Sequence, residues 1–146
     1  MDFQDKQYVI GIDLGTTNCA VSYVDVAALK EDRSTGRKPV EKKNLVKVFN
    51  VPQLTGHGEF TKIPVLPSFL YIPGKYDISK EVLKHPWKKR ADLFAGSFAR
   101  DHGSKIPSRL VSSAKSWLCN DKADRRAKIL PWGSEGFEKV SPVTAT

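Results

Sequence analysis

Three consecutive residues near the start of the chain could bind phosphate: Gly15, Thr16 and Thr17. A tight turn of one glycine and two hydroxyl residues can direct backbone N–H groups and hydroxyls at one point, which suits an anion. Asp13 precedes this turn and would repel a phosphate directly. It would suit a hydrated Mg²⁺ ion bridging to the phosphates, because Mg²⁺ keeps several waters and takes few carboxylates. An ordinary hairpin turn is the alternative, but an apolar strand ending at Asp13 favours a phosphate site.

Lys115 is the second residue whose setting suggests chemistry. It lies in a predicted helix over residues 109–119, where Val111, Ala114 and Leu118 recur at intervals of three and four. A lysine beside an apolar stripe can cover that stripe with its stem while its ammonium reaches water. The same ammonium, held by a rigid helix, can stabilise negative charge that develops during phosphoryl transfer. The residues alone leave both interpretations open.

Two apolar stretches flank the turn and predict a β-hairpin. Residues 9–12 and 19–24 are rich in the β-branched side chains typical of strands. Cys19 lies on the second predicted strand and is expected to be a small buried apolar residue. Cys19 and Cys119 are too far apart to form a metal-binding pair, and the three histidines share no metal-ligand spacing. The hairpin is therefore the element expected to position the phosphate turn.

Four segments, in this order, resemble segments of one protein family. Residues 10–18, IGIDLGTTN, are similar to the first phosphate motif of the superfamily that contains actin, sugar kinases and heat-shock chaperone ATPases. Three later segments resemble the DnaK-type seventy-kilodalton heat-shock chaperones: residues 66–71 (LPSFLY), 93–100 (LFAGSFAR) and 111–118 (VSSAKSWL). The resemblance extends over residues 8–118, which is most of the chain.

This resemblance implies a fold and a set of site residues. The expected fold is mixed α/β: part of an actin-like, ribonuclease-H-like ATPase lobe, with a sheet led by the hairpin, short helices and part of a smaller subdomain. In such a lobe Asp13 binds Mg²⁺ through water, and Lys115 reaches the γ-phosphate of ATP and the attacking water. The phosphates of ATP or ADP are bound by four residues of the turn: Gly15, Thr16, Thr17 and Asn18.

The resemblance also implies a function for the whole protein. DnaK-type chaperones hydrolyse ATP slowly during the stress response and use the nucleotide cycle to bind and release unfolded peptides. J-domain cochaperones and nucleotide-exchange factors are their partners. Residues 1–146 correspond to the N-terminal part of the ATPase domain, before the second glycine-rich phosphate motif and before any peptide-binding domain. We expect a fragment of a longer protein that does not turn over ATP by itself.

Two other functions compete with this one. A carbohydrate kinase of the same superfamily shares the first phosphate motif, but Pro67-Ser68 and Ala114-Lys115 are not expected in it. A basic, non-catalytic nucleic-acid-binding module would explain the net charge of +8 and the basic run at residues 84–90, which contains a tryptophan. No known nucleic-acid-binding motif accompanies that run, so nucleic acid is not the expected partner.

Composition favours a soluble, cytoplasmic domain. Hydrophobic residues make up 40% of the chain, which is enough for a core. No apolar run approaches the roughly 18 residues that a membrane-spanning helix needs. The first residues are polar and do not resemble a signal peptide. We therefore expect neither a membrane partner nor a secreted protein.

The remaining elements can be predicted only in outline. Residues 25–44 form a polar connection that is longer than usual for the family. Pro64 and Pro67 place residues 63–72 in an edge strand or an extended arm, because proline is excluded from the interior of central strands. Ser141 followed by Pro142 predicts the start of a helix. Four shorter predictions complete the outline: a strand at 45–51, a helix at 78–83, a strand at 93–95 and a helix at 97–102.

Overall fold

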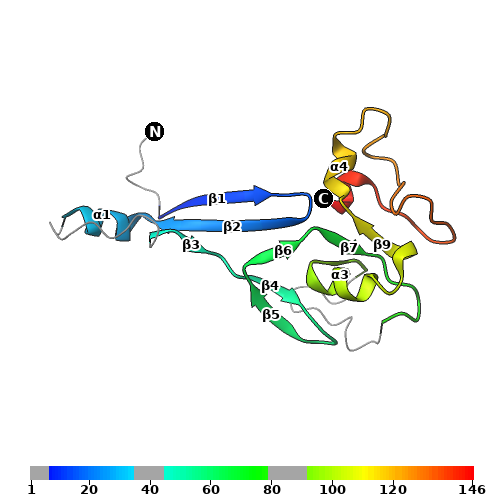
Figure 1. Ribbon diagram of the computed structural model, residues 1–146, viewed down its shortest axis with the longest axis horizontal. Coiled ribbons are helices and arrows are strands. Elements are labelled where there is room, and N and C mark those ends of the chain that lie inside the picture. The colour runs from blue at the N-terminus through cyan, green and yellow to red at the C-terminus, as the bar shows by residue number, and fades with distance from the viewer. Residues whose placement is uncertain (1–6, 35–44, 79–91) are drawn as a thin grey trace.

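The described residues form three small β-sheets and several short helices, a mixed α/β arrangement (Figure 1). The computed structural model describes residues 7–34, 45–78 and 92–146. The expected mixed α/β class is confirmed within these residues. The elements that matter for the candidate site are the hairpin at the start of the chain, two strands that follow it, and one helix from the last third of the sequence.

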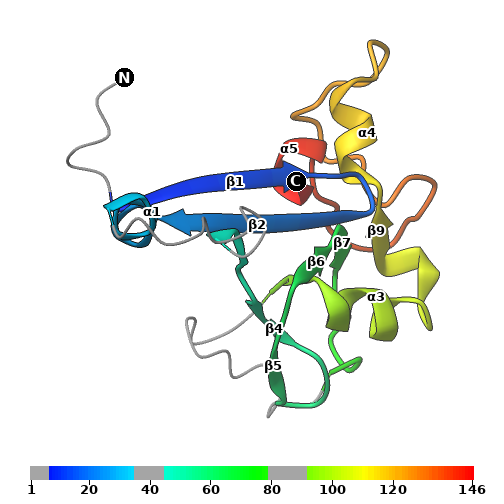
Figure 2. The same cartoon turned by 60° about the vertical axis from the view of Figure 1, so that its left-hand side comes forward.

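The first sheet is built on the predicted hairpin. β1 (Tyr8–Leu14) and β2 (Asn18–Asp25) are antiparallel, with a register that runs from Tyr8 opposite Asp25 to Leu14 opposite Cys19. β2 also pairs with β3 (Lys47–Val48) and with β6 (Val65–Pro67). Figures 1 and 2 show the hairpin as a long arm that projects from the rest of the molecule. Both strands extend beyond their predicted ends.

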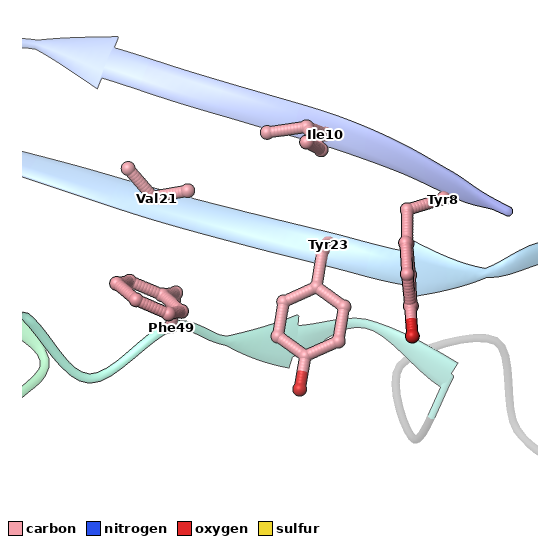
Figure 3. A pocket seen from close by; sticks show the side chains of 5 residues that line it. All are labelled: Tyr8, Ile10, Val21, Tyr23 and Phe49. Carbon is pink, nitrogen blue, oxygen red and sulfur yellow. The ribbon is translucent and has the colours of Figure 1, made fainter.

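β1 exposes apolar side chains on both faces. Because residues directly opposite each other share a face, the register groups Ile10 and Ile12 of β1 with Tyr23 and Val21 of β2. On this face a groove of about 340 Å³ is lined by five apolar or aromatic side chains (Figure 3): Tyr8, Ile10, Val21, Tyr23 and Phe49. The rings of Tyr8 and Tyr23 meet edge to face, with centroids 5.8 Å apart.

The other two sheets form the body of the molecule. β4 (Val51–Leu54) pairs with β5 (Phe60–Ile63), and β7 (Phe69–Tyr71) lies between β8 (Phe94–Ala95) and β9 (Leu110–Ser112). The helices are short: α1 (Val26–Ser34), α3 (Ser97–Gly103), α4 (Ala114–Leu118), α5 (Pro142–Ala145) and the 3₁₀ turn η1 (Pro107–Arg109).

β7 separates two hydrophobic clusters. Tyr71 points into one cluster, with Phe94 and Phe98. Leu70, on the opposite face of the same strand, points into the other cluster, with Val111 and Leu130. α3 therefore packs on one side of β7, and α4, through its buried Ala114, lies on the other. This arrangement fixes α4 relative to the strands that approach the hairpin.

A buried glutamine connects these layers. The side-chain amide of Gln53, 4% exposed, donates to the carbonyl of Val65 at 2.7 Å, and its Oε1 accepts from both the N–H and the hydroxyl of Ser97 at 3.1 Å. Gly96, at φ +81°, makes this possible, because a Cβ there would lie 2.5 Å from Oε1 of Gln53 and 2.8 Å from Leu66. β4, β6 and α3 are thus joined by one polar side chain.

One prediction about connections was wrong, and another was only partly correct. Residues 26–34 form a helix rather than a polar loop, because Oδ1 of Asp25 accepts hydrogen bonds from the N–H groups of Ala27 and Ala28 at 2.9 and 3.4 Å and caps that helix. Residues 35–44 lie outside the described part. The segment around the prolines was predicted correctly only in part: in the described sheets β6, which ends at Pro67, pairs with β2 alone and is an edge strand, whereas β7 is a central strand.

The helix predicted over residues 109–119 is correct only in its second half. Leu110–Ser112 is a strand, because it completes the sheet beside β7, and α4 begins at Ala114 after Ser113 adopts a left-handed conformation with φ 53°. The strand predicted at 45–51 is divided between β3 and the start of β4. The helix predicted at 78–83 lies outside the described residues except for Ile78.

Three local predictions are confirmed. β8 and α3 occur at the expected places, and α3 extends one residue beyond its predicted end, to Gly103. α5 starts at Pro142, and the hydroxyl of Ser141 accepts a hydrogen bond from the N–H of Thr144 at 3.1 Å. These elements depend on local signals in the sequence, which explains why they could be predicted.

Candidate phosphate-binding site

The turn between β1 and β2 consists of Gly15, Thr16 and Thr17. Both threonines are exposed, as is Asn18, the first residue of β2. Within the described residues, no acceptor takes a hydrogen bond from the backbone N–H groups of these three turn residues. Three adjacent donors at an exposed turn are the arrangement that the sequence predicted for an anion site.

Gly15 is required at its position by the neighbouring backbone. A Cβ at this residue would lie 2.5 Å from the carbonyl oxygen of Asn18, which is too close for any side chain. The clash is with backbone rather than with a movable side chain. The close approach of the two strand ends therefore depends on glycine.

Lys115 reaches this turn from the last third of the chain. Its Nζ donates to Oγ of Ser68 at 3.0 Å and to Sγ of Cys19 at 3.3 Å. The hydroxyl of Ser68 in turn donates to the carbonyl of Gly15 at 2.9 Å. The ammonium is thus one side chain away from the backbone of the turn. One interpretation of Lys115 was a side chain whose stem covers apolar surface while its ammonium reaches open water. The contacts of the ammonium with Ser68 and Cys19 disfavour that interpretation.

Asp13 is not brought together with Lys115. Asp13 lies opposite Ala20 in the hairpin register, whereas Cys19, which contacts Lys115, lies opposite Leu14. Successive residues of a strand point to opposite faces, so the carboxylate of Asp13 and the ammonium of Lys115 approach the hairpin from different sides. Asp13 is exposed. In the described ranges, no group of three or more His, Cys, Asp or Glu side chains could hold a metal ion.

Two residues of this site were missed or misjudged in the sequence. Ser68 was noted only as part of a resemblance, yet its N–H donates to the carbonyl of Thr17 at 2.8 Å and its Oγ lies between Gly15 and Lys115. Cys19 was expected to be a buried apolar residue, but it is half-buried and its thiol lies among polar atoms. Ser68 directly follows β6, and the pairing of β6 with β2 brings it to the turn, so no sequence signal identified its role.

A second polar cluster holds the end of β7. The hydroxyl of Tyr71 donates to Oδ2 of Asp77 at 2.8 Å, the N–H of Gly74 donates to the same oxygen at 2.7 Å, and Nε of Arg109 lies 3.8 Å from it. Burial raises the pKa of Tyr71, and the adjacent carboxylate raises it further. Burial opposes ionisation of Asp77, but the donors from Gly74 and Tyr71 and the charge of Arg109 outweigh it, so the pKa of Asp77 is lowered. The cluster ties a loop to the core.

A further cavity lies on the other side of α4. It has a volume of about 450 Å³ and is bordered by Trp117 and Trp132, whose ring centroids are 5.3 Å apart. Trp132 is 69% exposed. Trp117 follows Lys115 by two positions, which is a rotation of about 200° around a helix. The cavity therefore faces away from the phosphate turn.

Basic residues also occur at positions 125, 126 and 128, where the ammonium of Lys128 is paired with the carboxylate of Glu138, and the backbone N–H of Arg126 donates to Asp124. The run at 84–90 lies outside the described residues. No helix that the structure describes is both long and apolar enough to cross a membrane. Neither models of known protein families nor the sequences of curated proteins match this chain.

Proposed function

We propose that the chain is the N-terminal part of an actin-like ATPase lobe from a DnaK-type chaperone, and that the turn at Gly15, Thr16 and Thr17 binds the phosphates of ATP or ADP. The observation that carries the proposal is the contact of Lys115 with Ser68 and Cys19, which joins two segments that resemble this family and are far apart in the sequence. The free N–H groups of the turn support it.

Each part of the site has a chemical role in this proposal. The N–H groups and hydroxyls of the turn donate hydrogen bonds to the phosphate oxygens, and Asn18 extends the same polar edge. Lys115 supplies positive charge where negative charge grows on the transferring phosphoryl group; phosphoryl transfer depends mainly on such positioning and charge stabilisation. Asp13, a single exposed carboxylate, fits Mg²⁺ held through water rather than by a protein cage. A bound Mg²⁺ would neutralise phosphate charge.

The proposal includes a chaperone cycle in the complete protein. ATP binding and hydrolysis would control the binding of unfolded peptides, with J-domain cochaperones and nucleotide-exchange factors as partners in the cytoplasm. A carbohydrate kinase would need an acceptor site close to the phosphate turn. The aromatic cavity beside Trp117 lies on the opposite face of α4, so it does not support that alternative.

The test uses the complete protein that contains this chain. Formation of ADP from Mg-ATP is measured alone, with an unfolded peptide, and with a panel of hexoses. A slow basal rate that the peptide increases supports the chaperone. A rate that requires a hexose, with formation of a sugar phosphate, supports the kinase. The absence of any nucleotide binding by calorimetry would reject both.

A further inference from the structure

Ser68 makes contacts with both halves of the proposed phosphate site. Its hydroxyl donates to the carbonyl of Gly15 at 2.9 Å, its N–H donates to the carbonyl of Thr17 at 2.8 Å, and its Oγ accepts from Nζ of Lys115 at 3.0 Å. The N–H and the hydroxyl of Ser68 thus both bind the turn, and the hydroxyl also accepts a hydrogen bond from the ammonium of Lys115. We propose that Ser68 is a positioning residue that sets the geometry of the phosphate site.

The first consequence concerns the backbone of the turn. The carbonyl of Gly15 and the N–H of Thr16 belong to one planar trans peptide unit, so they point in opposite directions. When Ser68 holds the Gly15 carbonyl, it also directs the Thr16 N–H away from Ser68 and out of the turn. The hydrogen bond from the N–H of Ser68 to the carbonyl of Thr17 restrains the peptide unit between Thr17 and Asn18. A turn whose donors are already oriented binds an anion without the cost of ordering them.

The second consequence concerns the charge. A lysine side chain has four rotatable bonds, and its ammonium is held in place only where acceptors hold it. Ser68 and Cys19 are the two acceptors here, and the oxygen is both closer and the stronger acceptor of the two. Since the Ser68 hydroxyl uses its own proton on Gly15, its lone pairs remain available to Lys115. Removing Oγ of Ser68 therefore removes a restraint on the ammonium of Lys115 and a restraint on the carbonyl of Gly15 at the same time.

This inference rests on the proposed function, because it requires phosphate at the turn. The test records the backbone amide signals of the 146-residue chain by ¹H–¹⁵N NMR during titration with inorganic pyrophosphate. The variants are Ser68→Ala, which removes the hydroxyl, and Ser68→Thr, which keeps it. Lys115→Met removes the charge.

The wild-type chain should show saturable shifts of the Thr16 and Thr17 amides. Ser68→Ala should move the Thr16 signal before any ligand is added and should weaken pyrophosphate binding about tenfold, as expected when a hydrogen bond that orients a charged group is lost. Ser68→Thr should restore binding to within about twofold, because it keeps the hydroxyl. Unchanged signals from β7 and β9 would show that the fold is intact.

The possible outcomes separate the inference from the proposed function. If pyrophosphate does not shift the turn amides of the wild-type chain, the phosphate site itself is rejected. If Lys115→Met weakens binding and Ser68→Ala does not, the phosphate site stands and the role of Ser68 is rejected. If Ser68→Thr binds as weakly as Ser68→Ala, the hydroxyl is not the group responsible, and the inference is likewise rejected.

Discussion

Lys115 and Ser68 are 47 positions apart in the sequence, yet Nζ of the lysine lies 3.0 Å from Oγ of the serine. The contact connects α4 to the segment between β6 and β7, and through the Ser68 hydroxyl it continues to the carbonyl of Gly15 in the first hairpin. Three parts of the chain therefore meet at one hydroxyl.

Replacing Lys115 by Met should lower ATP hydrolysis in the complete protein by a factor of about 10² to 10³, as expected when one electrostatic group that stabilises the transition state is lost. Nucleotide affinity should change much less, because such an interaction affects kcat more than ground-state binding. Single-turnover hydrolysis and calorimetry measure the two quantities. Lys122→Met, at an exposed lysine beyond α4, is the matched control. An unchanged hydrolysis rate would contradict the proposed role of Lys115.

Replacing Gly15 by Ala should distort the phosphate turn, because the new Cβ would lie 2.5 Å from the backbone carbonyl of Asn18. Gly11→Ala in the same hairpin is the control, since its Cβ would meet only the side-chain oxygen of Ser22 at 3.0 Å. The amide signals of Thr16 and Thr17 should shift strongly in the first variant and weakly in the second. Equal shifts in both would show that the turn does not depend on Gly15.

Replacing Gln53 by Ala should lower the free energy of unfolding by roughly 2–4 kcal/mol, because the N–H of Ser97 and the carbonyl of Val65 would lose their buried partner. Lys62→Ala, at an exposed position of β5, should change stability by less than about 0.5 kcal/mol. Urea unfolding followed by circular dichroism gives both values. A loss no larger than that of the control would mean that water replaces the Gln53 contacts.

Stability should decrease in mild acid because of His102. Burial lowers the pKa of this imidazole below its usual 6.5, and the charges of Lys105 and His57 lower it further, against the opposing charge of Asp77. The unfolded chain therefore binds a proton at a higher pH than the folded chain. This contribution to stability is present above pH 6.5 and is lost as the pH falls toward the folded pKa.

The urea midpoint should therefore be lower at pH 5 than at pH 7.5, and His102→Phe should reduce that difference. Phenylalanine keeps the stacking of ring 102 on Phe98, where the centroids are 4.9 Å apart. A second decrease is expected below pH 3.8, because the pKa of Asp77 is also lowered in the fold. If the midpoint difference between pH 7.5 and pH 5 persists in His102→Phe, another group is responsible.

Local signals explain most of what the sequence predicted. The hairpin, α3 and the Ser141 cap each depend on a few neighbouring residues, and each was located nearly to its ends. The cap at Asp25 is an equally local signal, but the charged residues after it favoured a loop. Leu110–Ser112 was misassigned for a different reason. It has apolar residues at helical spacing, and only pairing with β7 makes it a strand.

The candidate site was predictable only in its separate parts. The turn and Lys115 were each recognisable from motifs, but no spacing in the sequence shows that Ser68 joins them, because that contact depends on how β6 pairs with β2. The position of Asp13 on the other face of the hairpin follows from the strand register, which the sequence does not define. The contacts between segments that are distant in the sequence are therefore the part of the site that could not be predicted.

The exposure of β1 has a consequence for any experiment on Asp13. Asp13 is the one charged residue among Tyr8–Leu14, and this strand presents Val9, Ile10 and Ile12 to solvent. A charge on an exposed apolar strand hinders pairing with strands of other molecules. A neutral substitution of Asp13 would therefore remove the proposed magnesium-binding carboxylate and a solubility determinant at the same time. Asp13→Glu retains the charge while displacing the carboxylate, so it separates an effect on magnesium from precipitation of the protein.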